Sequence, residues 1–248
     1  LKRLSEEGYE GITLSRSKPR NLPDGSFTWF PFDLTSGLPP VEIFDGIEGV
    51  FHLAGVTKAW SPEGFMRGNY LATKNLVMRV KTLRKELKFF LYLSSLAAAG
   101  PSSLGTPKRE EDPAMPVSFY GFSKLLSEGL VRSLKEEVAW IILRPPAVYG
   151  PGDRDFLQVF RLLKKRIGIK IKGSLSLIFV DDLVDGILKA VNSPRAYNEV
   201  FFISHEKWYR IDEFARLSAE LMGSWPPFLW ISENLIKMNL IPLKLLSR

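Results

Sequence analysis

The chain of 248 residues contains no cysteine and only two histidines, His52 and His205. Disulfide bonds, thiolate catalysis and cysteine-based zinc sites are excluded because each of them requires a thiol. Two histidines are also too few for a typical histidine-based metal site, so we predict no metal ion. His52 lies within a continuously apolar stretch, and we interpret it as a core residue. The absence of cysteine suits a reducing compartment, and we expect a cytoplasmic protein.

Long uninterrupted apolar runs are also missing. No stretch reaches the roughly 18 apolar residues of a membrane-spanning helix, and residues 1–8 lack the apolar core of a signal peptide. The apolar region 226–246 is broken by Glu233, Lys237 and Pro242. We expect a pair of core helices there, with a patch lying on a membrane surface as the alternative. The sequence therefore predicts no transmembrane segment.

The net charge is +7, from 34 basic and 27 acidic residues. A solvated basic surface explains this balance. Attraction to the phosphates of a dinucleotide or to nucleic acid is the other interpretation. Neither a zinc finger nor an aromatic RNA-binding motif accompanies the basic residues, so we predict no nucleic-acid partner.

Short β-like runs alternate with helical patterns along most of the chain. Strands are expected at 11–15, 27–32, 49–55, 89–94 and 139–144, and helices at 62–87 and 118–137. The runs 49–55 and 89–94 are continuously apolar, which is typical of strands buried on both faces. This order predicts parallel βαβ units and an α/β fold, a Rossmann-like doubly wound parallel sheet.

The regularity loosens after Asp153. Residues 145–152 are rich in proline and glycine and predict a loop. Strands at 176–180 and 200–204 and helices at 182–191 and 211–222 are expected beyond it, and Asp181 is the expected cap of the first of these helices. We predict a small C-terminal α+β part, with some of its segments returning to the sheet.

Tyr120 and Lys124 stand four residues apart on a predicted helix, so their side chains share one face. The reference pKa of a phenol is about 10, and a nearby cation lowers it. A tyrosine placed in this way can exchange a proton with an alcohol or a carbonyl oxygen. An ordinary exposed pair on a helix is the alternative.

Ser94 and Ser95 follow a predicted buried strand. Ligands of parallel α/β sheets lie beyond the carboxyl ends of the strands. A serine hydroxyl there can bond a substrate oxygen and stabilise the charge that develops on it. Alternatively, both hydroxyls satisfy backbone groups at the strand end.

With these motifs in order, the sequence resembles the extended short-chain dehydrogenases/reductases, also called the NAD-dependent epimerase/dehydratase family. The resemblance extends from residue 1 to about 222. Its matching runs are residues 50–55 (VFHLAG), 69–76 (NYLATKNL), 90–95 (FLYLSS), 120–124 (YGFSK), 143–152 (LRPPAVYGPG) and 179–183 (FVDDL).

The resemblance implies the catalytic roles. Tyr120 would be the general acid and base, and Lys124 would lower the pKa of Tyr120 and hold the nicotinamide ribose. Ser95, rather than Ser94, would orient the substrate oxygen. Asn69 occupies the position of the family's structural or relay asparagine.

The resemblance also implies where the cofactor, NAD or NADP, would lie. Leu53, Ala54 and Gly55 would line it, and Asp33 and Leu34 would contact the adenine. Pro145, Pro146 and Val148 would lie under the nicotinamide, although simple loop rigidity also explains the two prolines. Residues 1–152 would bind the dinucleotide, and residues 153–248 would mostly bind the substrate.

Arg16 follows the first predicted strand, where such proteins distinguish the two cofactors. An acidic residue there binds the ribose 2′-hydroxyl, whereas an arginine accepts a 2′-phosphate. The segment Ser15-Arg16-Ser17 contains no acid, which favours NADP over NAD.

The family's first strand and its glycine-rich turn are not found in this sequence. Such a turn brings the pyrophosphate to a helix N-terminus. We expect a fragment of a longer gene product, with a shortened protein as the alternative, and weak or no dinucleotide affinity for this chain alone.

An NAD(P)-dependent oxidoreductase is the predicted function, with hydride moving between the nicotinamide and a hydroxyl or keto carbon of a small organic substrate. The details most resemble members related to 3β-hydroxysteroid dehydrogenases and dihydroflavonol reductases. A nucleotide-sugar epimerase or dehydratase is the alternative, although Ala99 stands where many sugar-acting members have tyrosine. A non-catalytic dinucleotide-binding scaffold is the third reading. We expect a homodimer formed through the two long helices.

Overall fold

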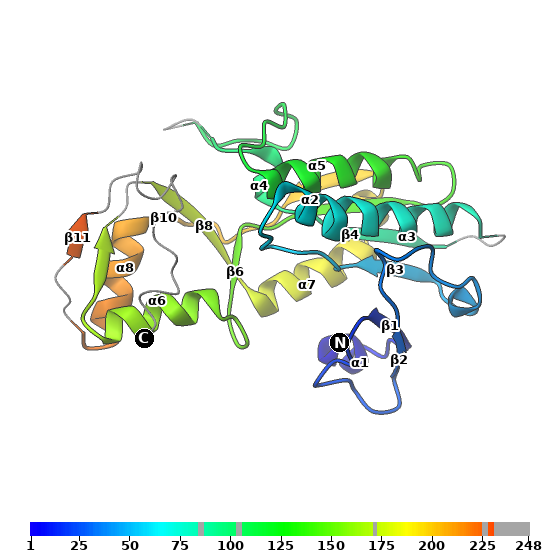
Figure 1. Cartoon of the computed structure of the whole chain (residues 1–248), viewed down its shortest axis with the longest axis horizontal. Coiled ribbons are helices and arrows are strands. Elements are labelled where there is room, and N and C mark those ends of the chain that lie inside the picture. The colour runs from blue at the N-terminus through cyan, green and yellow to red at the C-terminus, as the bar shows by residue number, and fades with distance from the viewer. Residues whose placement is uncertain (84–86, 103–105, 171–172, 225–227, 231–248) are drawn as a thin grey trace. The chain divides into compact units, whose positions relative to one another are not determined.

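The computed structural model describes residues 1–83, 87–102, 106–170, 173–224 and 228–230. The chain divides into two compact units (Figure 1). The first comprises Leu1–Pro145 and Val184–Ile203, and the second comprises Pro146–Leu183 and Ser204–Arg248. The assignment of dinucleotide binding and substrate binding to separate parts of the chain stays a prediction.

The first unit is built on parallel strands, as predicted. Four of them pair in the order β3-β4-β5-β9, namely β3 (Gly49–His52), β4 (Phe89–Leu93), β5 (Trp140–Arg144) and β9 (Glu199–Phe202). A second parallel pair consists of β1 (Gly11–Ser15) and β2 (Phe27–Pro31), preceded by the short helix α1 (Lys2–Glu6). Every residue of β5 and four of the five in β4 are buried, because central parallel strands are covered on both faces.

Helices cover both faces of the four-stranded sheet (Figure 1). One face carries α2 (Pro62–Phe65), the π-helical segment Met66–Leu71, α3 (Ala72–Lys81) and α5 (Phe119–Arg132); residues 184–191 of α7 (Val180–Val191) lie on the other. The core between α3, α5 and the sheet includes Val77, Val131 and Leu134 packed with Phe90 and Ile142. Short 3-10 turns, Glu42–Phe44 and Pro194–Ala196, lie in the connections.

The two long helices differ from the prediction in their bounds. The expected helix 62–87 is interrupted by the π-helical segment and ends at Lys81, where the hydroxyl of Thr82 donates to the carbonyl of Arg79. The expected helix 118–137 ends at Arg132. Apolar spacing continues past both ends, so periodicity alone overestimated their lengths.

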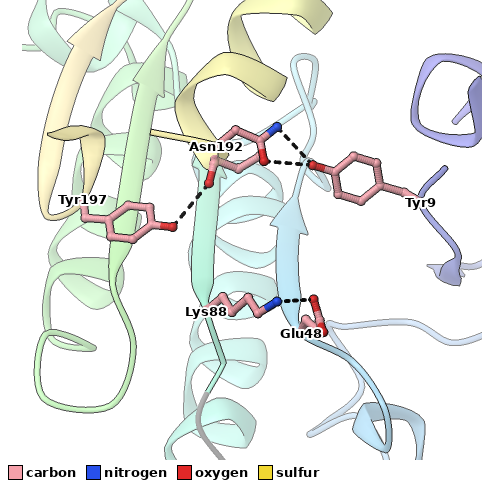
Figure 2. Close-up of polar contacts among 6 residues, drawn as sticks. Tyr9, Glu48, Lys88, Asn192 and Tyr197 are labelled. Atoms are coloured by element: carbon pink, nitrogen blue, oxygen red, sulfur yellow. Dashed lines mark hydrogen bonds and ion pairs between the residues drawn. The ribbon is translucent and has the colours of Figure 1, made fainter. Parts of the chain in front are cut away.

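Side-chain contacts join the amino-terminal ends of the strands in the first unit (Figure 2). The amide of Asn192 lies 3.2–3.3 Å from the hydroxyl of Tyr9. Tyr197 donates to the last carbonyl of α7, and Lys88 Nζ lies 2.7 Å from a carboxylate oxygen of Glu48. These contacts therefore lie at the opposite end of the strands from their carboxyl ends.

The described part of the second unit contains small sheets and helices. Its three-stranded sheet has the order β10-β8-β6, with β6 (Ala147–Tyr149), β8 (Ser174–Phe179) and β10 (Trp208–Arg210), and a parallel pair is formed by β7 (Gly168–Lys170) and β11 (Phe228–Trp230). Its helices are α6 (Asp155–Lys164) and α8 (Ile211–Leu221). Rings from these elements contact one another at centroid distances of 5.4–6.4 Å in an aromatic cluster of Tyr149, Phe156, Phe160, Phe179, Tyr209 and Phe214.

Several predictions for this part of the chain were wrong. Residues 147–149 form β6 within the stretch predicted as a loop, because they pair with β8. Asp181 lies in the first turn of α7 instead of capping it. The helix α6 was not predicted from the sequence. The pair of core helices expected in the apolar region 226–246 lies outside the described residues, apart from the three residues of β11.

Within the described part of the chain, no helix combines the length and the apolarity needed to cross a bilayer.

Candidate active site

The predicted catalytic residues meet where β4 ends and α5 begins. Ser95 is the N-cap of the short helix α4 (Leu96–Ala99), and its hydroxyl accepts a 3.1 Å hydrogen bond from the backbone N–H of Ala97. Ser118 caps α5 in the same way, accepting from the backbone N–H of Gly121 at 3.1 Å. The two caps fix where both helices begin.

Gly121 allows the two helices to approach closely. A Cβ atom at this position would collide with the backbone carbonyl of Ala97. Glycine therefore permits the contact between α4 and α5 that brings Ser95 to Tyr120.

The Ser95 hydroxyl and the phenol of Tyr120 interact. Burial is the larger influence on the pKa of Tyr120 and raises it, while this interaction with Ser95 acts to lower it. The net shift is upward, opposite to the lowering expected from a neighbouring lysine. At neutral pH the phenol is therefore protonated and able to donate.

Lys124 is buried one turn further along α5, with 4% of its surface exposed. Its Nζ donates to the carbonyl of Leu93 at 2.6 Å and lies 4.4 Å from the ring centroid of Tyr92. Burial lowers the pKa of Lys124 to about 8, against the attraction of Glu128, which raises it. Removal of the ammonium from water is thus the main effect.

Asn69 holds the π-helical segment against neighbouring chain segments. Its Oδ1 accepts from the backbone N–H of Val56 at 2.8 Å, and its Nδ2 donates to the carbonyl of Val56 and to Ser123 Oγ. With 1% exposure, its amide is fully occupied by these contacts. π-Helical turns are frequent at functional sites.

The segment after β3 offers open backbone beside these residues. Leu53, Ala54 and Gly55 are exposed. A Cβ at Gly55 would lie 2.9 Å from Asn69 Oδ1 and 3.7 Å from Lys124 Nζ. The glycine leaves this space free, so the segment fits a bound cofactor that packs against backbone.

Of the residues predicted on the adenine side, Arg16 and Asp33 interact, whereas Leu34 lies in the hydrophobic core. Arg16 is exposed, and its charge contributes to lowering the pKa of Asp33, whose carboxylate mainly accepts hydrogen bonds from Thr35. Leu34 is 9% exposed and belongs to the hydrophobic core, where its carbonyl accepts from Asn75. Contact of these residues with an adenine stays a prediction.

The predicted nicotinamide-side residues divide between the units. Pro145 is buried in the first unit, and its carbonyl accepts from the backbone N–H of Leu96 at 2.9 Å. Pro146 and Val148 belong to the second unit and are half-buried. Their role under a nicotinamide stays a prediction.

Glu128 and Arg144 are buried polar residues next to this site that the sequence analysis did not single out. Glu128 accepts from Ser94 at 2.5 Å and from two guanidinium nitrogens of Arg144 at 2.9 and 2.6 Å. Ser94 is thereby committed to a structural contact, while Ser95 faces Tyr120. One signal in the sequence could have indicated this pair. Glu128 and Arg144 are opposite charges within a helix and a strand that were both expected to be buried.

His52 is a core residue, as predicted. It is 2% exposed, and its Nε2 lies 2.8 Å from Thr73 Oγ1. Burial lowers the pKa of His52 to about 3, and the nearby charge of Lys124 adds to this effect.

Comparison with known proteins decides the family. The sequence model described as the NAD dependent epimerase/dehydratase family matches residues 1–203. The chain belongs to this family. The resemblance inferred from its motifs is therefore confirmed.

Relatives within the NAD-dependent epimerase/dehydratase family include different activities. The UDP-glucose 4-epimerase of Vibrio cholerae is 33% identical over 55% of this chain and 43% of its own length. The ceramide reductase of Caulobacter vibrioides is 29% identical over 73% of this chain and 52% of its own length. The chain thus spans about half the length of these relatives.

A solved structure of a protein named MoeE5, in complex with UDP-glucuronic acid and NAD, is 26% identical to the chain. It superposes with a TM-score of 0.78 and covers 93% of this chain and 80% of its own. The agreement confirms the predicted Rossmann-like fold.

Proposed function

We propose that this family member is an NAD(P)-dependent oxidoreductase that transfers hydride between a nicotinamide and a hydroxyl or keto carbon of a small organic molecule. The observation that carries the proposal is the meeting of Ser95, at the end of β4, with Tyr120 and the buried Lys124 on α5. The cofactor, when bound, supplies or accepts the hydride.

The chain's own residues would move the proton. In the reductive direction, Ser95 orients the carbonyl oxygen and Tyr120, which is protonated at neutral pH, donates a proton to it as negative charge develops. Lys124 would hold the ribose. Its ammonium would stabilise the negative charge that remains on Tyr120 as the proton leaves. Asn69 fixes the backbone beside Gly55, where the cofactor would lie.

NAD or NADP is the proposed cofactor. The complex of MoeE5 with NAD supports NAD, whereas the exposed Arg16 favours a 2′-phosphate. Titration of the protein with both cofactors decides between them, and Arg16→Asp should weaken binding of NADP more than binding of NAD if the arginine reads the phosphate.

The decisive assay follows oxidation of NADH or NADPH in the presence of a panel of ketones. We expect Tyr120→Phe to lower kcat/KM by about 10²–10⁴-fold, because proton donation is lost. Tyr197→Phe is the matched control, since that hydroxyl donates to a backbone carbonyl at the amino-terminal end of the strands. Equal activity of wild type and Tyr120→Phe would contradict the proposal.

A nucleotide-sugar epimerase or dehydratase is the second candidate. The Vibrio epimerase and the MoeE5 complex favour it, whereas Ala99 in place of tyrosine favours other substrates. Interconversion of UDP-sugars without net consumption of the dinucleotide would identify this activity. A non-catalytic scaffold would need neither Ser95 beside Tyr120 nor a buried lysine.

We further propose a cytoplasmic homodimer that pairs through α3 and α5. Met78 on α3 and Phe122 on α5 are 44% and 49% exposed and offer apolar contacts. Sedimentation of wild type and of a Met78→Glu variant tests this pairing, which predicts that the added charge yields monomers.

A further inference from the structure

Three side chains on α5 follow one another at intervals of four residues. Tyr120, Lys124 and Glu128 therefore form one stripe along the helix. The first two belong to the proposed proton-transfer site. Glu128 continues the stripe into the interior, where only 1% of its surface is exposed.

The end of β4 presents three consecutive residues to this stripe. The carbonyl of Leu93 accepts from Lys124 Nζ at 2.6 Å, and the hydroxyl of Ser94 donates to the carboxylate of Glu128 at 2.5 Å. Ser95, the next residue, interacts with the phenol at the start of the stripe. Each strand-end residue thus has its own partner on the helix, so a shift between strand and helix would disturb all three contacts.

Arg144, the last residue of β5, completes the arrangement. Its Nε and Nη2 bond the two carboxylate oxygens of Glu128, and the guanidinium is 3% exposed. The pairing is bidentate and links α5 to a second strand with defined geometry. Both charges are buried away from water, so each depends on the other for compensation. Loss of either partner would leave an unpaired buried charge, which is strongly unfavourable.

We propose that Glu128, Arg144 and Ser94 form a positioning unit that holds Lys124 and Tyr120 at the end of β4. The unit sets the helix against the two strand ends and supplies a balanced pair of charges one turn from the ammonium. None of its members needs to touch a substrate, so each acts through Lys124. The proposal rests on the proposed function only for the chemical use of Lys124.

Several groups face Lys124 from the elements packed around it. His52 lies on β3 and Tyr92 on β4, and the ammonium lies over the Tyr92 ring. Tyr120 and Glu128 flank it on α5, and Arg144 stands behind Glu128. The histidine is neutral because burial lowers its pKa to about 3, so Glu128 and Arg144 are the charges whose balance the unit controls.

Direct titration of the Lys124 ammonium by ¹⁵N nuclear magnetic resonance tests the proposal. The protein is labelled with ¹⁵N-lysine, and the signal is assigned from its absence in Lys124→Arg. We expect Glu128→Gln to lower the pKa of Lys124 by about one unit or more, because the positive charge of Arg144 then lacks its partner. Arg144→Gln should raise the pKa of Lys124 by a similar amount, because the negative charge of Glu128 then lacks its partner. The double variant should return close to wild type.

An ion pair that did not act on Lys124 would not produce these opposite shifts. Glu136→Gln is the matched control, because Glu136 is an exposed residue paired with Lys135, and it should leave the titration unchanged. If Glu128→Gln and Arg144→Gln leave the pKa of Lys124 unchanged, or shift it in the same direction, the proposal is wrong.

Ser94→Ala provides a test that leaves both charges in place, should the single charge variants not fold. We expect faster exchange of the Lys124 ammonium protons with water, since the strand end is no longer fixed to the helix. Ser127→Ala is its control, because the buried Ser127 hydroxyl donates to a carbonyl of its own helix. Equal exchange rates in Ser94→Ala and wild type would overturn the positioning role.

These measurements do not require turnover. Failure of the proposed function would appear as hydride transfer that does not depend on Tyr120, with the shifts of Lys124 intact. Failure of the positioning unit would appear as unchanged shifts, whatever the activity.

Discussion

The two units differ in the polar and charged side chains that they bury. The first buries aliphatic strands together with charged residues, and each of Lys124, Glu128 and Arg144 has a hydrogen-bond partner. In the second, the described interior has buried aliphatic residues such as Leu163 and Ile178 beside half-buried aromatic rings, and Ser224 is its only buried polar residue. A closed interior can hold charges in fixed positions, which a proton-transfer site needs.

Replacement of one phenylalanine in each unit tests this difference, and the largest effect is expected here. Phe90 in β4 is completely buried, so Phe90→Ala should cost about 3–5 kcal/mol of unfolding free energy. Phe214 in α8 is only half-buried, and Phe214→Ala should cost less. Urea denaturation measures both. Equal losses would show that the second unit is packed as tightly as the first.

The buried serines give the next comparison. Ser94 donates to a charged carboxylate, so Ser94→Ala should cost about 1.5–3 kcal/mol. Ser224 in the second unit donates to the carbonyl of Leu163 at 2.6 Å, and Ser224→Ala should cost about 0.5–1.5 kcal/mol. The same denaturation experiment ranks the two. The reverse order would mean that the Glu128 carboxylate does not depend on Ser94.

The two histidines give a further expected effect, which depends on pH. The folded-state pKa of His52 is about 3, below the value of about 6.5 in an unfolded chain. The unfolded state therefore binds the extra proton between these values, and stability is lost as the pH falls below 6.5. The loss should approach about 1.4 kcal/mol per pH unit for this one group.

Stability measured between pH 7 and pH 5 tests the assignment to His52. His52→Gln should flatten this dependence, whereas His205→Gln, which replaces an exposed histidine of the second unit, should not. An unchanged slope in His52→Gln would contradict a neutral buried histidine.

The accuracy of the sequence analysis follows the same division between the units. Buried parallel strands such as β4 and β5 appear as apolar runs, and the helices between them show clear periodicity, so their order was predictable. The second unit has short strands and half-buried rings. The three residues of β6 form a strand only because β8 lies beside them, which no local pattern reveals.

Motif spacing likewise predicted part of the candidate site. It placed Tyr120 and Lys124 on one helical face and Ser95 at a strand end. The resemblance also placed Ser95 ahead of Ser94, whose hydroxyl faces Glu128. The direction expected for the pKa of Tyr120 was wrong. Burial depends on the packing of the whole chain. At Tyr120 its effect on the pKa exceeds the effect that was expected from the neighbouring Lys124.

By itself, the sequence determined the alternation of strands and helices, the family and the stripe of Tyr120 and Lys124, because periodicity and motif spacing are local properties. Only the tertiary structure decided that Arg144 pairs with Glu128 and that Lys124 binds the carbonyl of Leu93. These partners lie 16 and 31 residues apart. Their contacts exist because folding brings the ends of two strands against one face of a helix and removes water from between them.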